Sequence, residues 1–136
     1  MASSTYTPAE VARVAAFRAA LRTFLRRSER IARDSGLTPQ RHLLLLMIKG
    51  APDGSEKSTV TELAERLQLA QSSVTELVRR AEEAGLVERE RSPVDGRVAY
   101  LRLTAEGERR LERAFTTHDS ERRELREAFA QLDGAP

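Results

Sequence analysis

The sequence of 136 residues contains no cysteine and no tryptophan, and only 4% of its residues are aromatic. Without cysteine the chain forms no disulfide, holds no thiolate-bound metal and has no thiol redox sensor. Its only two histidines are His42 and His118, so a dedicated zinc site is not expected. We therefore expect no cofactor.

Long apolar runs are also missing. No run approaches the roughly 18 residues that indicate a membrane-spanning helix, and the opening MASSTYTPAE lacks the basic and apolar segments of a signal peptide. The sequence therefore predicts no membrane partner and a cytoplasmic location. The length suits one domain or compact subunit that buries its own core.

Lysine is nearly absent, since only Lys49 and Lys57 among the 23 cationic residues are lysines. A biased genome composition explains this as readily as a preference for planar, phosphate-matching cations. The distribution of the arginines is more informative. Residues 11–33 hold seven arginines and one acid, and residues 89–102 hold four arginines and two acids.

Apolar residues at steps of three and four predict long helices at both ends of the chain. The first spans residues 8–34, and the last begins after Thr104, where the sequence leaves open whether residues 117–120 break it. Between them, the LLLLMI run predicts a buried helix over residues 39–50, followed by a polar loop over residues 51–58. The terminal stripes comprise Val11, Val14, Phe17, Leu21, Phe24, Ser28 and Ile31, and Leu111, Phe115, His118, Leu125, Phe129 and Leu132.

The middle of the chain predicts a winged helix–turn–helix. Thr59 and Glu62 form a capping box that opens a short helix, and a second helix runs from about residue 71 to 85. Two short strands over residues 86–91 and 98–103 flank an Asp-Gly turn. A short helix, a tight turn, a second helix and a hairpin in this order match the motif. The predicted fold is mainly α, with long terminal dimerisation helices and a small β-hairpin wing.

The second helix of this motif has one apolar and one polar face. At about 100° per residue, its apolar residues cluster on one side, and small polar side chains gather at the exposed N-terminal end. Such an end can enter a DNA major groove, where Ser and Thr meet phosphates or base edges and Gln pairs with adenine. The alternative is the solvated face of a helical bundle. The candidate DNA-binding residues here are Gln71, Ser72, Ser73, Thr75, Glu76 and Arg79.

The hairpin favours DNA, because a helical bundle has no use for an arginine-bearing protrusion and a narrow minor groove attracts arginine. Arg97 lies near the predicted tip and is the candidate for insertion. Asp95 has two plausible roles, shaping the turn and steering the Arg97 guanidinium. Arg89 and Arg91 are candidate phosphate contacts, or serve solubility alone.

The segment TVTELAERLQLAQSSVTELVRRAEEAGLVERERSPVDGRVAYLRLTAEG, residues 59–107, resembles the winged helix of the MarR family of bacterial transcription regulators. The DGR turn and the LRLTAEG exit match that family's wing, and LTPQ before the buried helix fits as well. The resemblance implies a homodimer on a pseudo-palindromic operator in double-stranded DNA, usually a repressor released by a small ligand. It places residues 71–79 in the major groove and Asp95 with Arg97 at the wing.

Three positions depart from the family pattern. Gln68 stands where the turn often has glycine, and Ala70 replaces the usual Ser or Thr cap, which leaves the helix weakly capped. Glu76 occupies a site often held by a basic residue. It either pairs with Arg79 or Arg80 at helical spacing or accepts a hydrogen bond from cytosine.

The two terminal stripes exceed what one chain can cover, so a second copy related by two-fold symmetry is expected. The division is then a dimerisation helix over residues 1–37, a DNA-binding domain over 38–104 and a second dimerisation helix over 105–136. The two recognition helices on one face of the dimer are then expected to bind half-sites whose centres lie roughly 34–36 Å apart.

The family resemblance also implies an effector site between the dimer helices and the winged helix. Phe17, Phe24 and His42 are the candidates to line it, and a small aromatic compound is the expected effector. The same residues equally fit two core aromatics and a hydrogen-bonded histidine. His118, on the last stripe, is expected at the dimer seam, where protonation could tune packing.

Three other classes of function remain as alternatives. An enzyme is disfavoured because Ser72 and Ser73 have no histidine nearby in the sequence, and the chain has no glycine-rich phosphate loop or zinc-ligand spacing. A winged helix used only for protein contact does not explain the wing arginines. A metal-sensing winged helix of another family is disfavoured by the absent cysteines and scarce histidines.

Overall fold

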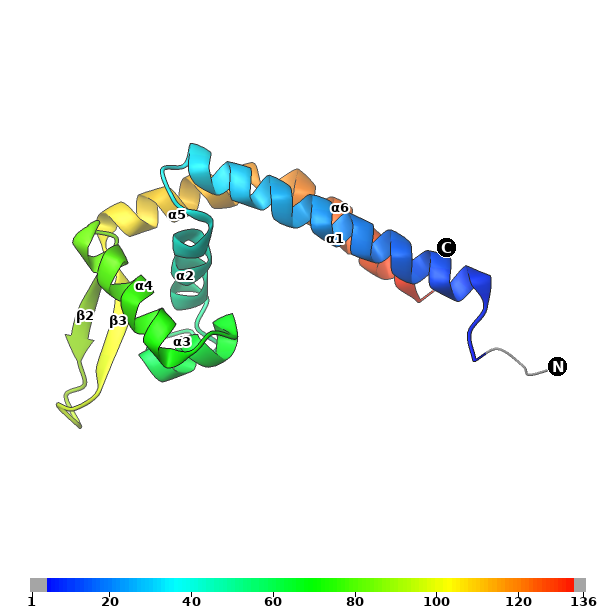
Figure 1. Cartoon of the computed structure of the whole chain (residues 1–136). Coiled ribbons are helices and arrows are strands. Elements are labelled where there is room, and N and C mark those ends of the chain that lie inside the picture. Colours follow the sequence, from blue (N-terminus) through cyan, green and yellow to red (C-terminus); the bar gives the residue numbers. More distant parts are fainter. Residues whose placement is uncertain (1–4, 134–136) are drawn as a thin grey trace.

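The computed structural model describes residues 5–133 and has two parts (Figure 1). A long arm of antiparallel helices projects from a compact unit that carries the other helices and a small sheet. The elements are α1 (Pro8–Asp34), α2 (Pro39–Lys49), β1 (Lys57–Ser58), α3 (Val60–Leu67), α4 (Gln71–Glu83), β2 (Val87–Arg91), β3 (Ala99–Leu103), α5 (Ala105–Thr117) and α6 (Asp119–Leu132). This is the predicted winged helix–turn–helix with long terminal helices.

The arm consists of α1 and α6, which come from opposite ends of the sequence. A capping box starts α1, where the Thr7 hydroxyl accepts from the Glu10 amide and the Glu10 carboxylate accepts from the Thr7 amide. Farther along, Phe17 packs edge-on against Phe129 with ring centroids 5.6 Å apart. Helices from opposite ends of the sequence therefore form one antiparallel pair.

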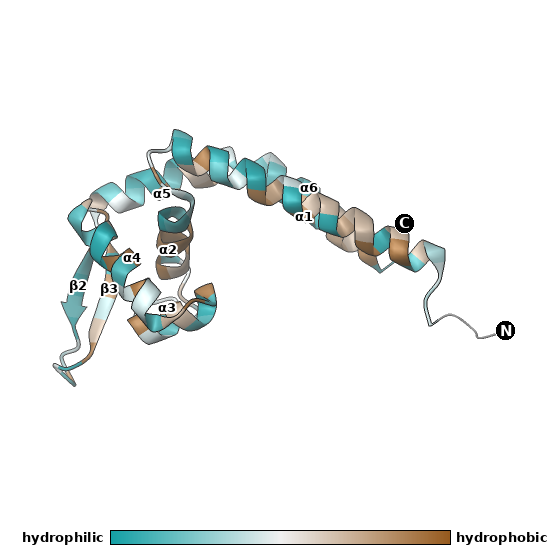
Figure 2. Ribbon diagram, in the orientation of Figure 1, coloured by the Kyte–Doolittle hydropathy of each residue, from teal (hydrophilic) through white to brown (hydrophobic). Residues whose placement is uncertain are grey.

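The arm also exposes apolar side chains. Figure 2 shows hydrophobic residues as brown bands along both of its helices. About half of the surface of each exposed side chain is accessible, and these side chains are Val11, Val14, Leu25 and Phe129. Arginines share the same helices, and no helix within residues 5–133 is long and apolar enough to cross a membrane. Apolar surface of this extent on a charged helix indicates a protein partner.

The core lies in the compact unit and is centred on α2, as the LLLLMI run predicts. Leu44, Leu45 and Ile48 are fully buried there. The prediction that α2 is buried on all sides is wrong at Leu43, which is 41% exposed beside the arm. The rest of the core comes from the arm's base, α3, α4, the sheet and α5, and includes Ala32, Leu37, Leu63, Val74, Val78, Ala81, Leu86, Leu101 and Leu111.

The turn between α3 and α4 explains one of the departures from the family pattern. Gln68 ends α3 in the left-handed conformation, with φ 56° and ψ 47°, which glycine adopts at least cost. Its side-chain amide donates to the Glu65 carbonyl oxygen at 2.6 Å. That hydrogen bond offsets part of the backbone strain, so the turn forms without glycine.

The sheet has three antiparallel strands in the order β1-β3-β2, where the sequence predicted only two. The polar loop predicted over residues 51–58 is wrong at its end. Lys57 pairs with Arg102 and Ser58 pairs with Leu101, and the Ser58 side chain is buried. A strand of two residues is too short to show an alternating pattern, and β3, with which it pairs, lies far away in the sequence. No local pattern could therefore reveal β1.

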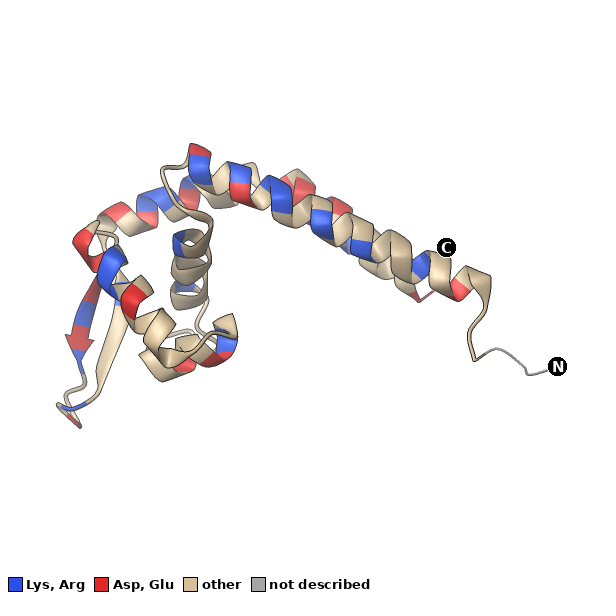
Figure 3. Ribbon diagram, viewed as in Figure 1, with Lys and Arg blue, Asp and Glu red and all other residues tan. Residues whose placement is uncertain are grey.

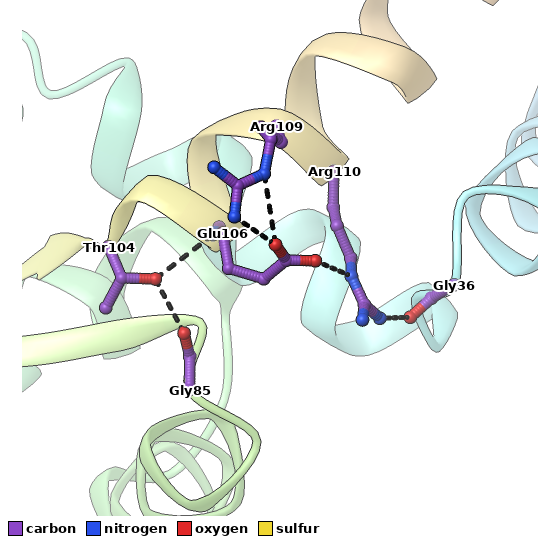
Figure 4. Close-up of polar contacts among 7 residues, drawn as sticks. Gly36, Gly85, Thr104, Glu106, Arg109 and Arg110 are labelled. Carbon is purple, nitrogen blue, oxygen red and sulfur yellow. Dashed lines mark hydrogen bonds and ion pairs between the residues drawn. The ribbon is translucent and has the colours of Figure 1, made fainter.

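The start of α5 joins the arm to the compact unit (Figure 4). The Thr104 hydroxyl donates to the Gly85 carbonyl oxygen at 2.6 Å and accepts from the Gly107 amide at 3.1 Å. One turn later, the Arg110 guanidinium donates to the carbonyl oxygen of Gly36, in the α1–α2 loop, at 2.6 Å. The ends of α1 and α4 are thus both fixed to α5.

The last helix is broken at His118, which settles the question left open for residues 117–120. His118 is only 4% exposed and packs against Phe24 of α1 and His42 of α2, with ring centroids 5.9 and 5.5 Å away. The prediction that His118 lies on the exposed stripe at a dimer seam is wrong. The break redirects the chain, so this side chain is enclosed within its own subunit.

Candidate nucleic-acid interface

The apolar face of α4 packs on the core, so its polar face points outward. Val74, Leu77, Val78 and Ala81 are buried, as the predicted angular clustering requires. The other side presents exposed polar residues to solvent, with Glu76 half-buried between them. These exposed residues are Gln71, Ser72, Ser73, Thr75 and Arg79.

The first turn of α4 lacks a side-chain cap, because its N-cap residue is Ala70. Amide groups of an uncapped first turn, together with the helix dipole, attract an anion such as a phosphate. Gln71 at this end donates from its side-chain amide to the Thr61 hydroxyl at 3.3 Å. Its amide therefore links α3 to α4 in the free protein.

Glu76 is held by two arginines on its own helix. Its carboxylate accepts from Arg79 Nε at 3.0 Å and from Arg80 Nε at 3.1 Å, and Arg79 also pairs with Glu83. The hydrogen bond from Arg79 is the main cause that lowers the pKa of Glu76 to about 2, and Arg80 adds to it. The carboxylate stays ionised, and its ion pairs keep both arginines close to the helix surface. A contact from Glu76 to cytosine stays a prediction.

The wing tip is built around Ser92 and Asp95. The Ser92 hydroxyl accepts from the amides of Val94 and Asp95, both at 3.2 Å. The Asp95 carboxylate accepts from the Arg97 amide at 3.0 Å and from Arg97 Nε at 3.2 Å, and these contacts lower the pKa of Asp95. The Arg97 side chain is nevertheless 92% exposed. Asp95 therefore both shapes the turn and orients a guanidinium that is free to meet a ligand.

The two other candidate arginines of the wing, Arg89 and Arg91, brace the hairpin. Arg89 Nε donates to Glu82 of α4 at 3.0 Å, and Arg91 donates to the Gly96 carbonyl oxygen at 2.7 Å. Either arginine must exchange this partner before it can meet a phosphate, so their role in DNA contact stays a prediction.

The distribution of charge differs between the two parts of the molecule (Figure 3). Basic and acidic residues alternate on α4 and β2, whereas a row of basic residues follows α1. The wing therefore presents an exposed cation at its tip, Arg97, rather than a broad basic surface. Because net charge is only +2, the positions of individual arginines matter more than the total.

A hollow of about 440 Å³ lies beside α4 and contains two residues that the sequence did not single out as contacts. Arg80 lines it, and so does Gln40 from the first turn of α2. Arg80 was considered only as an ion-pair partner of Glu76. Gln40 belongs to the LTPQ segment, and only the fold brings it next to α4. Both are exposed and belong to the candidate interface.

The three candidate effector residues lie at three separate hollows. His42 lines one of about 240 Å³ between α1 and α2. Phe24 lines a second of about 450 Å³ between α1 and α6, and Phe17 lines a third of about 370 Å³ nearer the end of the arm. Within one subunit, these residues do not form a common pocket.

Comparison with known proteins identifies what the chain is similar to. The model of the MarR family matches residues 35–98. YsmB, an HTH-type transcriptional regulator of Bacillus subtilis (strain 168), is 37% identical over 71 residues, which cover 52% of this chain and 49% of that protein. The chain thus spans about half the length of this curated relative.

Solved structures share the fold over a longer part of the chain. A MarR family protein from Bacillus stearothermophilus is 29% identical, with a TM-score of 0.71 over 88% of this chain and 79% of that one. A mutant MarR from E. coli, solved in complex with operator DNA, is 22% identical, with a TM-score of 0.61 over 77% and 76% of the two chains. At that level of identity, the second likeness concerns the fold alone.

Proposed function

Because this chain belongs to the MarR family of winged helix–turn–helix transcriptional regulators, we propose that it binds operator DNA as a homodimer. The family consists of regulators and not of enzymes. The observation that carries the proposal is the exposed Arg97 guanidinium, oriented by Asp95 at the tip of the wing. Such a regulator acts where the chromosome lies, in the bacterial cytoplasm.

The N-terminal half of α4 is the proposed reading element for the major groove. Ser72, Ser73 and Thr75 are small, exposed and able to donate to phosphates or base edges. The uncapped first turn supports a phosphate contact at the same end. Gln71 reaches adenine only after it releases Thr61, which makes its contact conditional on a fitting base.

The wing is the proposed minor-groove element. A narrow minor groove concentrates negative potential, which attracts an inserted arginine. Arg97 is presented for this purpose at the tip, beside Val94, which is 95% exposed. Arg89 ties the hairpin to α4, and Arg91 closes the turn of the hairpin. Both are proposed as phosphate contacts that exchange partners on binding.

Replacing Arg97 with alanine is expected to weaken DNA binding by about 1–3 kcal/mol, as for a single specific contact. The melting temperature is expected to stay unchanged, since among residues 5–133 the only side chain to which the Arg97 guanidinium donates is Asp95. Binding to DNA from upstream of the gene, measured by fluorescence anisotropy across a salt titration, checks this. The control is Arg123→Ala, which removes the same charge from α6. Equal affinities for the two variants would remove the wing from the account.

Replacing Glu76 with glutamine is expected to strengthen binding to DNA of random sequence. The change releases Arg79 and Arg80 from a shared carboxylate, and each new phosphate contact steepens the salt dependence by about 0.9. Glu112→Gln makes the same change in charge at an exposed site on α5 and serves as the control. A salt slope identical to that of the unmodified protein would contradict the release of the arginines.

The homodimer is supported by the arm, whose apolar side chains remain exposed in the single subunit. Their burial against a second copy stabilises the pair at about 25 cal/mol per Å² of apolar surface. We further propose that residues 1–37 and 105–136 form the dimerisation part and residues 38–104 the DNA-binding part. The continuous packing of α1 against α6 supports this division.

We also propose that the protein is a repressor and that a small aromatic compound releases it. The hollow lined by Phe24 lies between α1 and α6, and the hollow lined by His42 lies between α1 and α2. A thermal-shift screen with small aromatic acids tests this proposal. The absence of a shift with every compound would leave these hollows without an effector role.

A further inference from the structure

The two histidines of the chain meet at the joint between the arm and the compact unit. His42 of α2 and His118 at the α5–α6 break are each 4% exposed, and their ring centroids are 5.5 Å apart. Phe24 of α1 also stacks on His118, with ring centroids 5.9 Å apart. A chain with only two histidines therefore places both in one buried contact that joins three elements.

The surroundings of this pair do not stabilise a protonated imidazole. His118 Nε2 is buried without a hydrogen-bond partner among residues 5–133. On α6, Arg122 disfavours a proton on His118, and Glu121 favours it more weakly. The charged groups that α1 brings nearby are Glu29, in the hollow that His42 lines, and Arg27 near Glu121. Within residues 5–133, no charged side chain of α2 or α5 shifts the pKa of either imidazole.

Burial lowers the pKa of both imidazoles below their ordinary value. For His118 the cation of Arg122 lowers it further, and for His42 the neighbouring His118 does so. Both rings are therefore neutral at neutral pH. The contact is favourable while both rings are neutral and becomes unfavourable once either ring is charged.

We propose that the His42–His118 contact is a proton-operated switch that separates α2 from the arm in acid and thereby releases the protein from DNA. The release rests on the DNA-binding function proposed above, whereas the separation does not. A proton on either ring places a cation against a second imidazole, and on His118 it also faces Arg122. Separation of the two rings admits water and relieves the repulsion. Because α2 is the centre of the compact unit, its movement changes the spacing of the two reading helices in the dimer.

The sign of the effect follows from the lowered pKa values. The unfolded chain takes up protons near pH ~6.5, and the folded chain takes them up only at lower pH, so stability is full above that value and falls as pH decreases through the folded pKa. Acid otherwise makes a protein more cationic and strengthens its attraction to phosphates. Glu76, with a pKa of about 2, does not titrate in this range. Weaker DNA binding in acid is thus opposite to the general trend.

Titration of the two imidazoles by NMR is the first test. With two histidines in the sequence, the spectrum contains two imidazole signals, and His118→Phe assigns them by removing one. We expect both signals of the dimeric protein to titrate below the ordinary pKa, and the His42 signal to shift toward it in His118→Phe. Titration of both groups at or above the ordinary value would overturn the proposal.

DNA binding between about pH 7.5 and 5.5 is the second test. The unmodified protein is expected to lose affinity about tenfold for each pH unit below the pKa, if one proton must leave before DNA binds. His118→Phe keeps an aromatic ring against Phe24 and removes one of the two titrating imidazoles, so it is expected to lose less affinity over this pH range than the unmodified protein. His42→Gln serves as the second variant should the first fail to fold. The same pH dependence in the variant and the unmodified protein would overturn the switch.

The melting temperature separates failure of the switch from failure of the proposed function. If the protein binds no DNA even at pH ~7.5, DNA binding is refuted, but the switch still predicts a larger loss of melting temperature in acid for the unmodified protein than for His118→Phe. Equal losses would overturn the switch independently of DNA.

Discussion

Replacing Gly107 with valine is expected to destabilise the fold by about 3 kcal/mol or more. A Cβ atom at this position in the first turn of α5 would lie 2.1 Å from the carbonyl oxygen of Leu86 and 3.1 Å from its carbonyl carbon. The Leu86 carbonyl cannot easily move away, because it accepts from the Thr104 amide at 3.0 Å. Stability totals of about 5–15 kcal/mol make such a loss large enough to leave much of the protein unfolded.

Urea denaturation followed by circular dichroism measures this loss. Gly96→Ala is the matched control, because the added Cβ meets nothing within 4 Å and the residue does not have a positive φ. We expect the control to remain within about 0.5 kcal/mol of the unmodified protein. A Gly107 variant with an unchanged midpoint would show that α5 does not sit against Leu86 as described.

Replacing Leu25 with glutamate is expected to convert the dimer to a monomer and to weaken operator binding by about 10²–10⁴-fold. Leu25 is half-exposed and lies on the same side of α1 as Val14, three turns earlier, in the apolar surface proposed to meet the second copy. A buried, unpaired carboxylate opposes association. A monomer then binds each half-site alone and loses the gain in effective concentration that a linked pair provides.

Light scattering and anisotropy on the same sample test this expectation. Thr23→Glu is the control, because Thr23 is an exposed polar residue of α1 outside the apolar set named above and gains the same charge. The control is expected to remain a dimer and to bind as the unmodified protein does. A monomer mass for the unmodified protein at micromolar concentration would contradict the homodimer.

The fold was largely predictable because its signals are local. The periodicity of residues 8–34, the capping box of Thr59 and the Asp-Gly turn each determine one element from neighbouring residues. The order of these elements then left few arrangements other than a winged helix. The same applies to the contact between Asp95 and Arg97, whose partners are two residues apart.

The features that escaped prediction depend on contacts between distant parts of the chain. β1 forms only because β3 lies beside it, and Gln40 reaches α4 only through the fold. His118 belongs to an apolar stripe by sequence, but the break in the helix turns it toward His42. Periodicity locates the face of a straight helix and gives no information about a bend.

Selection of bound fragments from random double-stranded DNA tests the central claim most directly. The account predicts enrichment of a pseudo-palindrome whose half-sites lie roughly 34–36 Å apart, one helical turn from centre to centre. It also predicts that Arg97→Ala loses the preference at positions read by the wing. Recovery of unselected fragments at low salt, or of no DNA at all, would contradict the account.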